Sequence, residues 1–214
     1  MGDGKKGSIS VLASCIAIFW PGAFIFSFPG VMGPHWQQML GVSRAATGRT
    51  LFFVLAAVGI FMFITGKLQE KLGPSRLVAL GAVLCGVSTI LVGYAQKIGQ
   101  IYLWAFTMGV ASSLIYIPTL TVVQQWYPAK RGLVSGLVNL SFGLSGAVMS
   151  PVFAKLLTVL SYKNMTLFLG PLAMAIGFLS AFLVRLPDFL PALKDQNTHK
   201  DLKDKKEFTL SETL

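Results

Sequence analysis

The stretch IYLWAFTMGVASSLIYIPTLTVV, residues 101–123, carries no charged side chain. About 20 consecutive apolar residues cross the hydrocarbon core of a bilayer as a helix, so this stretch is long enough to span. A lone strand in hydrocarbon would leave its backbone N–H and C=O groups unpaired, which makes a helix the economical state. Residues 101–123 therefore predict a transmembrane helix.

Other uncharged stretches of the chain have the same character. The predicted spans lie at residues 9–28, 50–65, 77–94, 101–123, 132–154 and 166–184. Hydrophobic residues make up 54% of the 214 residues and charged residues only 12%, which is too apolar for a soluble core of this size. We therefore predict an all-α membrane protein with a six-helix bundle over residues 1–186 and a tail over residues 187–214.

The basic residues alternate across the predicted membrane. One side holds most of them, namely Lys5, Lys6, Lys67, Lys71, Arg76, Lys130, Arg131, Arg185 and the lysines of the tail. The other side holds Arg44, Arg49, Lys97 and Lys163. By the positive-inside rule, both termini are predicted to be cytoplasmic, in the plasma (inner) membrane. The net charge of +10 is thus mainly a topology signal, with attraction to the lipid bilayer's anionic headgroups as a second effect. Its spread over several loops argues against nucleic-acid binding.

The acidic residues and cysteines exclude several kinds of site. All 8 acidic residues lie in the predicted cytoplasmic segments, so no carboxylate is predicted inside the membrane. Buried carboxylates are the usual proton or cation relays, and any such relay must come from outside this chain. Cys15 and Cys85 lie in predicted spans as small packing residues. We predict no disulfide, no metal site and no cofactor.

The connection GKLQEKLGPSR, residues 66–76, resembles the signature loop of the major facilitator superfamily, G-x-L-x-D-R-x-G-R-R. Glu70 stands at the position of the Asp and Pro74 at that of an Arg. We expect the two glycines to allow close helix packing and a turn, and Glu70 to pair with Arg76. In that family the loop holds the two halves of a transporter together on the cytoplasmic side. The resemblance implies a conformational gate formed by Gly66, Glu70, Lys71, Gly73 and Arg76. An ordinary basic loop is the alternative.

The run WYPAKRG, residues 126–132, ends the fourth predicted span and begins the fifth. This run is similar to the oxalate/formate antiporter and monocarboxylate transporter branch of the superfamily. The stretch GVSRA at residues 41–45 shares this similarity, and so do the flanking residues Gly109, Ser113, Tyr116, Ser135, Gly136, Phe142 and Gly143. The resemblance covers residues 8–186. It implies the N-terminal half of a secondary transporter, an antiporter or symporter, that moves small organic anions such as mono- or dicarboxylates by alternating access. Phe26 and Phe28 depart from the tyrosine and tryptophan that this branch often carries in the first span.

Small residues recur along one face of the fifth predicted span. They are spaced four and three residues apart, at Gly132, Gly136, Asn139, Gly143, Gly146 and Ser150. Gly146-x-x-x-Ser150-Pro151 also resembles a weakened form of the superfamily's antiporter motif. Small faces let helix backbones approach closely in lipid. We expect this face either to pack within the bundle or to contact a second six-helix half.

Aromatic and polar residues mark a candidate substrate path. The resemblance implies an aromatic wall of Phe26, Tyr116 and Phe142. Asn139 and Tyr116 are expected either to line a central cavity or to form hydrogen bonds between helices. Arg49 and Lys155 lie in the outer thirds of their spans, where they would attract an anion, although snorkelling to the headgroups is the favoured explanation.

An intramembrane protease is the enzyme class to weigh. Residues 143–146, GLSG, match the G-x-S-G of rhomboid proteases, which also have six spans. The serine needs a histidine base from another span. The histidines are His35, predicted in the first outside loop, and His199 in the tail. We therefore predict that the chain is not an enzyme.

After Leu186 the composition shifts to Lys, Asp, Asn and Thr, which predicts a solvated cytoplasmic linker. In the transporters that the chain resembles, such a segment leads into the seventh of twelve spans. A truncated or split product that requires a second half is therefore expected. The alternatives are a non-transporting six-helix scaffold or regulatory subunit, and a non-functional fragment.

Overall fold

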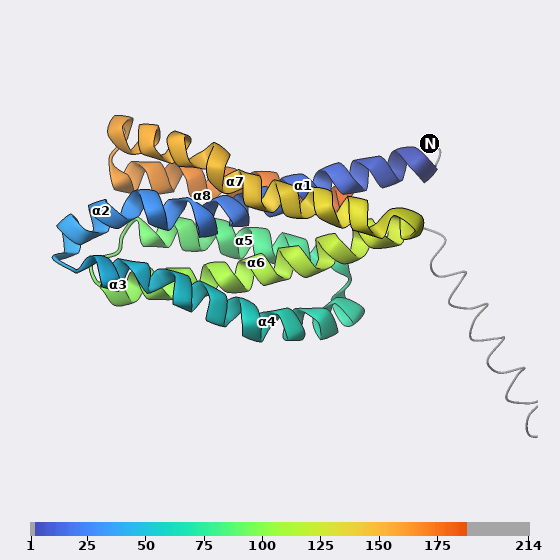
Figure 1. The fold of residues 1–214 in the computed structure, drawn as a ribbon, viewed down its shortest axis with the longest axis horizontal. Helices are drawn as coiled ribbons and strands as arrows, with labels where there is room; N and C mark the ends of the chain where they lie inside the picture. Colours follow the sequence, from blue (N-terminus) through green and yellow to red (C-terminus); the bar gives the residue numbers. More distant parts are fainter. Residues whose placement is uncertain (1–2, 188–214) are drawn as a thin grey trace, which may run out of the picture.

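The computed structural model describes residues 3–187, and every regular element in that range is helical (Figure 1). The elements are α1 (Asp3–Phe26), α2 (Phe28–Leu40), α3 (Arg44–Gly48), α4 (Thr50–Leu72), α5 (Pro74–Val92), α6 (Ile98–Trp126), the short 3-10 helix η1 (Pro128–Lys130), α7 (Arg131–Val159) and α8 (Tyr162–Leu183). They supply 6 stretches long and apolar enough to span a membrane, with α1 and α2 forming the first and α3 and α4 the second. The predicted all-α fold is confirmed. The predicted linker lies, from residue 188 onward, outside the described residues.

The first span is longer than predicted. An outside loop with His35 was expected after residue 28, but α2 continues as helix to Leu40. The two helices meet at Ser27, and Pro29 lies in the first turn of α2, where its missing N–H breaks no helical hydrogen bond. Gly41 ends α2 with φ 63°, a left-handed conformation that glycine adopts easily. The loop prediction was wrong because prolines and glycines lower the local hydropathy, whereas the fully buried Trp36 anchors α2 to the core.

The helices pack as a bundle with two open edges. α4 packs on α6, α6 on α5 and α5 on α8, while α1 packs on α6, α7 and α8. Figure 1 shows α1 and α7 along one long side and α4 along the opposite side. Only 17% of the most apolar stretch of α4 and 28% of that of the α7 span are buried, against 61% for α6. The edge helices α4 and α7 therefore leave much of their surface open.

Glycines form the closest helix crossings. A Cβ atom on Gly86 would lie 2.5 Å from the Cβ of Met174 and 2.7 Å from the carbonyl oxygen of Gly170. α5 and α8 therefore touch backbone to backbone. Gly22 of α1 lies against Phe142 of α7 in the same way. Lipid provides no hydrophobic drive between helices, so close packing of this kind holds the bundle together.

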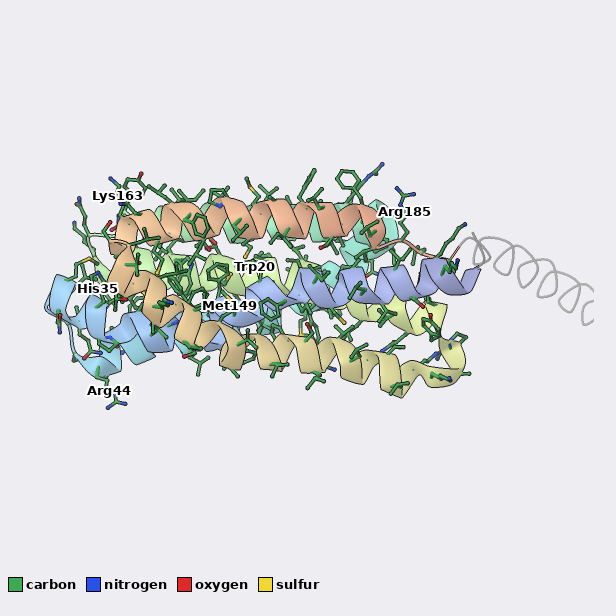
Figure 2. All side chains as sticks on the ribbon, turned by 90° about the horizontal axis from the view of Figure 1, so that it is seen from above. Trp20, His35, Arg44, Met149, Lys163 and Arg185 are labelled. Atoms are coloured by element: carbon green, nitrogen blue, oxygen red, sulfur yellow. The ribbon has the colours of Figure 1, made fainter. Side chains whose placement is uncertain are left out.

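One end of the bundle carries Arg44 and Lys163, and we call it the Arg44 end (Figure 2). A buried hydrogen-bond relay joins three helices there. Trp36 Nε1 donates to the Tyr162 hydroxyl oxygen at 2.9 Å, and the Tyr162 hydroxyl donates to the Val92 carbonyl at 2.9 Å. This relay fixes α2 against the ends of α5 and α8.

Arg185 lies at the opposite end, which we call the Arg185 end (Figure 2). Trp126 Nε1 donates to the Arg185 carbonyl at 2.7 Å, and Ser75 Oγ donates to the Val184 carbonyl at 2.5 Å. The ends of α6 and α8 and the start of α5 therefore meet there. Among residues 3–187, the basic residues predicted to be cytoplasmic fall in the segments of this end, and those predicted to be external fall at the Arg44 end.

Large apolar side chains cover the outside of the bundle. Phe63 is 69% exposed, Leu133 72% and Leu179 65%. A surface of this kind is stable against lipid and not against water. With 6 helices of spanning length, the chain is an integral membrane protein.

Candidate functional site

The structure brings four of the candidate path residues together where α1, α6 and α7 meet. The Phe26 and Phe142 ring centroids are 5.0 Å apart, and those of Tyr116 and Phe142 are 5.6 Å apart. The Tyr116 hydroxyl donates to Asn139 Oδ1 at 2.7 Å. Residues from α1, α6 and α7 thus form one aromatic and polar cluster.

This cluster borders a small cavity. The cavity has a volume of about 190 Å³, and Phe26, Tyr116 and Phe142 line it with Ser112, Ser113 and aliphatic side chains of α4. We call it the central cavity. Its wall is mainly apolar, and hydroxyl groups and the nearby Asn139 amide are its polar groups. An arrangement of this kind orients a small ligand through a few hydrogen bonds.

Phe26 lies at the junction of α1 and α2. It is the last residue of α1, it is followed by the irregular Ser27, and it is 54% exposed. On the α7 side of Phe26, a Cβ atom on Gly146 would lie 2.9 Å from the Phe26 Cβ. Gly146 therefore provides the space that lets Phe26 lie close against the α7 backbone.

A larger pocket adjoins the central cavity toward the Arg44 end. This Arg44 pocket has a volume of about 720 Å³ and lies between α2, α3 and the start of α4. Ile25, Phe26 and Leu51 line both hollows, so these side chains lie between the two. The two hollows together follow the long axis of the bundle from the Arg44 end toward its middle.

Arg44 is the charged residue of the Arg44 pocket. Gln37 Nε2 donates to Thr47 Oγ1 at 3.4 Å, and Thr47 Oγ1 donates to the Arg44 carbonyl at 3.0 Å. Glu70 is the one acidic residue whose side chain the structure describes, and it does not line this pocket. Arg44 therefore gives the pocket an uncompensated positive charge.

Sequence reasoning missed Arg44 as a site residue and used it for topology and as part of the GVSRA stretch. The available signal was Ser43, which caps α3 by accepting a hydrogen bond from the Ala46 backbone N–H at 3.3 Å. A capped short helix after Gly41 would have predicted an ordered segment that holds Arg44 in place. The Arg44 pocket depends on the fold of α2, and the sequence prediction did not include this helix.

The two basic candidates, Arg49 and Lys155, lie elsewhere. Arg49 is exposed between α3 and α4, and Lys155 is exposed on α7. Neither residue lines the Arg44 pocket or the central cavity. The structure therefore does not bring them into the aromatic cluster.

The predicted gate forms a tight turn at the Arg185 end. α4 ends at Leu72, and Gly73 has φ 78°, which lets the chain turn directly into α5 at Pro74. A residue with a Cβ would be strained at this φ. Gly73 therefore has the turning role that its position in the motif predicts.

The polar groups of the gate face away from the bundle. Glu70, Lys71 and Arg76 are exposed, and within the described chain no ion pair joins Glu70 to Arg76, contrary to our expectation. A Cβ atom on Gly66 would meet nothing within 4 Å, so this glycine makes no close helix contact in the described bundle. These groups are accessible to a partner.

The small-residue face of α7 divides into two parts. A Cβ atom on Gly132, Gly136 or Gly143 would meet nothing within 4 Å. Gly146, in contrast, packs on Phe26, while Ser150 is half-buried and Pro151 is exposed. Most of this face therefore does not pack against the described bundle.

Ser145 and His35 are placed for packing. Ser145 is fully buried, and its hydroxyl donates to the Phe142 carbonyl at 2.6 Å. The His35 ring lies 4.9 Å from the Tyr162 ring at the Arg44 end. This geometry does not form a serine–histidine dyad.

Known proteins resemble the chain over most of its length. The sequence profile of the Major Facilitator Superfamily matches residues 12–211. An uncharacterized 38 kDa protein of Thermoproteus tenax is 32% identical over 149 residues, which are 69% of this chain and 38% of that protein. Monocarboxylate transporter 13 of Rattus norvegicus is 23% identical over 185 residues, 85% of this chain and 42% of that protein.

A probable sulfoacetate transporter of Cupriavidus necator is also similar. It is 20% identical over 156 residues, which are 72% of this chain and 36% of that protein. The chain thus spans less than half the length of each of these relatives.

Proposed function

Because the chain belongs to the Major Facilitator Superfamily, we propose that it is one six-helix half of a secondary transporter that carries small organic anions by alternating access. Such transporters hold the substrate between two helical repeats that rock about it. Mono- and dicarboxylates are the proposed substrates. The chain supplies one wall of the substrate path, and the second half supplies the other.

The observation that carries this proposal is the pair of neighbouring hollows that share Phe26. The Arg44 pocket offers the Arg44 guanidinium, which forms no ion pair with a described side chain, and the central cavity offers hydroxyl groups and aromatic rings. A guanidinium binds carboxylates through paired, charge-assisted hydrogen bonds. An anion would meet Arg44 first and then pass Phe26 to reach Tyr116 and Asn139.

The names of two relatives support the anion class. One relative is a monocarboxylate transporter and another is a probable sulfoacetate transporter, and both names denote small organic anions. Asn139 also fits this class. Its Oδ1 accepts from Tyr116, and among the described residues no group accepts a hydrogen bond from its amide N–H groups, which are therefore free to donate to an anion.

The open edges of the bundle support a requirement for a second half. α4 and α7 are the least buried spans, and Gly66, Gly136 and Gly143 each face open space. Close approach of small residues is the usual basis of helix association in lipid. The proposed second half packs on these two edges and closes the central cavity.

The proposed location is the plasma (inner) membrane, with both termini in the cytoplasm. The Arg185 end carries most of the basic residues and would face inward by the positive-inside rule. The Arg44 pocket would then open to the outside, where it would receive an anion before transport.

Uptake into proteoliposomes tests the proposed function. Vesicles contain the chain alone, or the chain co-expressed with a C-terminal six-helix half taken in turn from the relatives. We expect uptake of labelled oxalate, formate or lactate only when both halves are present, because the chain alone has half a site. Full-rate transport by the chain alone would contradict the half-site proposal. An active assembly that carries only cations or neutral solutes would contradict the anion class.

The substitution Arg44→Gln is expected to raise the KM for a carboxylate about three- to tenfold with little change in kcat. Arg44 attracts the anion at the mouth of the path, and this attraction is partly screened because the side chain is exposed. Initial uptake rates at several substrate concentrations measure both constants. Added salt should raise the KM of the unsubstituted transporter more than that of the variant.

Arg49→Gln is the matched control. Arg49 lies at the same end and is also exposed, but it does not line the Arg44 pocket. The control should leave KM within about twofold of the original value, as for an exposed charge away from the path. An equal rise in KM for both variants would show that general surface charge, rather than the pocket, attracts the substrate.

A further inference from the structure

A third hollow lies outside the proposed substrate path, between α1 and α7. Its volume is about 560 Å³, and it opens on the outer surface of the bundle. Leu12 of α1 and Leu137, Leu140 and Leu144 of α7 line it, each 48% to 62% exposed. We call it the α1–α7 groove.

The interior of the groove is apolar because its polar groups are paired. Ser141 Oγ donates to the Cys15 carbonyl at 2.8 Å, which joins the two helices across the groove floor. At the Arg185 end, the Ser8 and Tyr127 hydroxyls share a hydrogen bond of 3.2 Å. The groove is therefore suited to a hydrocarbon chain along its length and to polar groups only at this one end.

Cations surround that polar end. Lys5 precedes the lining residue Ser8 by three positions, and Arg131 precedes the lining residue Val134 by three. Residues three apart lie on the same face of a helix, one turn along. Lys130 lies in the turn between α6 and α7, and its backbone N–H donates to the Tyr127 carbonyl at 3.0 Å. Lys5, Lys130 and Arg131 are exposed and form no ion pair with a described residue.

The groove is separate from the edge assigned to the second half. At 100° per residue, the leucines of the groove lie on a different face of α7 from the open glycines. The leucines are Leu137, Leu140 and Leu144, and the glycines are Gly132, Gly136 and Gly143. A second half packed on the glycine face would leave the groove facing lipid.

We propose that the α1–α7 groove binds an anionic phospholipid from the leaflet at the Arg185 end. An acyl chain lies along the leucines, and the phosphate lies beside Lys5, Lys130 and Arg131. Charge complementarity selects this occupant, since basic groups at the end of an interhelical groove attract anionic headgroups. A zwitterionic lipid fits the same groove but gains less from these cations.

Native mass spectrometry of the purified 214-residue chain tests this proposal. The chain is titrated with phosphatidylglycerol or with phosphatidylcholine of the same acyl chains. We expect phosphatidylglycerol to bind more tightly. The double variant Lys130→Gln/Arg131→Gln should lower phosphatidylglycerol affinity about 25-fold, because each basic residue contributes about fivefold. It should hardly change phosphatidylcholine affinity.

Two further variants separate this site from general surface charge. Lys71→Gln/Arg76→Gln removes the same charge at the same end, but at the junction of α4 and α5. It should retain the lipid preference. Leu137→Trp fills the groove and should weaken the binding of both lipids, while the melting temperature shows whether the chain remains folded.

The proposal is overturned by any of three results. These are equal affinity for the two lipids, an equal loss of phosphatidylglycerol binding in the two double variants, and lipid binding that Leu137→Trp does not change. A dimer of the chain that Leu137→Trp abolishes would also overturn it, because a second copy would then occupy the groove.

Discussion

Replacing Gly136 and Gly143 by tryptophan is expected to abolish anion uptake by the assembled transporter and to leave the isolated chain folded. Both positions face open space in the described bundle, so the bundle itself has room for the new rings. In the assembly they would lie against the second half. Helix packing in lipid depends on close backbone approach, and overpacking costs about 1–3 kcal/mol at each site.

The loss should be between about fivefold and about 150-fold for each glycine, since about 1.4 kcal/mol corresponds to a factor of ten. The initial rate of uptake measures the function of the assembly. Co-purification of a tagged second half measures its formation. The melting temperature of the isolated chain in detergent should stay within a few degrees of the original value, because the new side chains displace nothing in the described bundle.

Leu179→Trp is the control for the added ring. Leu179 is on α8, away from both edge helices, and is 65% exposed. A tryptophan there should meet lipid only, so uptake and co-purification should be unchanged. If Gly136→Trp/Gly143→Trp retained full transport, the second half would have to pack on another face of the bundle.

The spans were predictable from the sequence because their signal is local. A run of apolar residues without charge is sufficient to predict a helix in lipid, and the predicted spans 50–65, 101–123 and 132–154 lie within α4, α6 and α7. The predicted span 9–28 crosses Ser27 between α1 and α2, and the spans 77–94 and 166–184 end one or two residues beyond α5 and α8. α2 was missed because its stability comes from tertiary contact. Trp36 is fully buried and bonds to Tyr162, which lies far away in the sequence.

The candidate site was predictable only in part, for the same reason. The resemblance to known transporters selected Phe26, Tyr116 and Phe142, and the fold brings their rings together. The Arg44 pocket needs the packing of α2 on α3, which no local pattern in the sequence encodes. Gly146 shares the spacing of the open glycines, but the folded bundle places the Phe26 side chain against it.

The substitution Glu70→Gln is expected to lower transport turnover about tenfold without destabilising the isolated chain. Glu70 is exposed in the last turns of α4, near the negative end of the helix dipole. A carboxylate is unfavourable at this place, so its charge does not serve the stability of α4. We propose that Glu70 instead accepts charge-assisted hydrogen bonds from the second half when the gate is closed.

Loss of that contact removes the bias toward one conformation of the transporter. A hydrogen bond to a charged group contributes about 1.5–3 kcal/mol, and a bias of about 1.4 kcal/mol shifts a two-state equilibrium tenfold. Turnover is measured as kcat for uptake. The melting temperature of the isolated chain should be unchanged or slightly raised, because removing the charge relieves the unfavourable interaction with the helix dipole.

Lys67→Gln is the control within the same helix, because the Lys67 ammonium lies 4.6 Å from the centroid of the Phe63 ring and is engaged by its own bundle. The kcat of the Lys67→Gln variant should change by less than about twofold, because this contact has no part in the gate. An exposed cation–π contact contributes only about 0.5–1 kcal/mol to folding. Glu70→Asp keeps the charge and should restore part of the turnover. A gate residue acts on the equilibrium between conformations and not on the folding of one half. A Glu70→Gln variant that loses stability but keeps its turnover would therefore contradict the gate and favour a purely structural role for this loop.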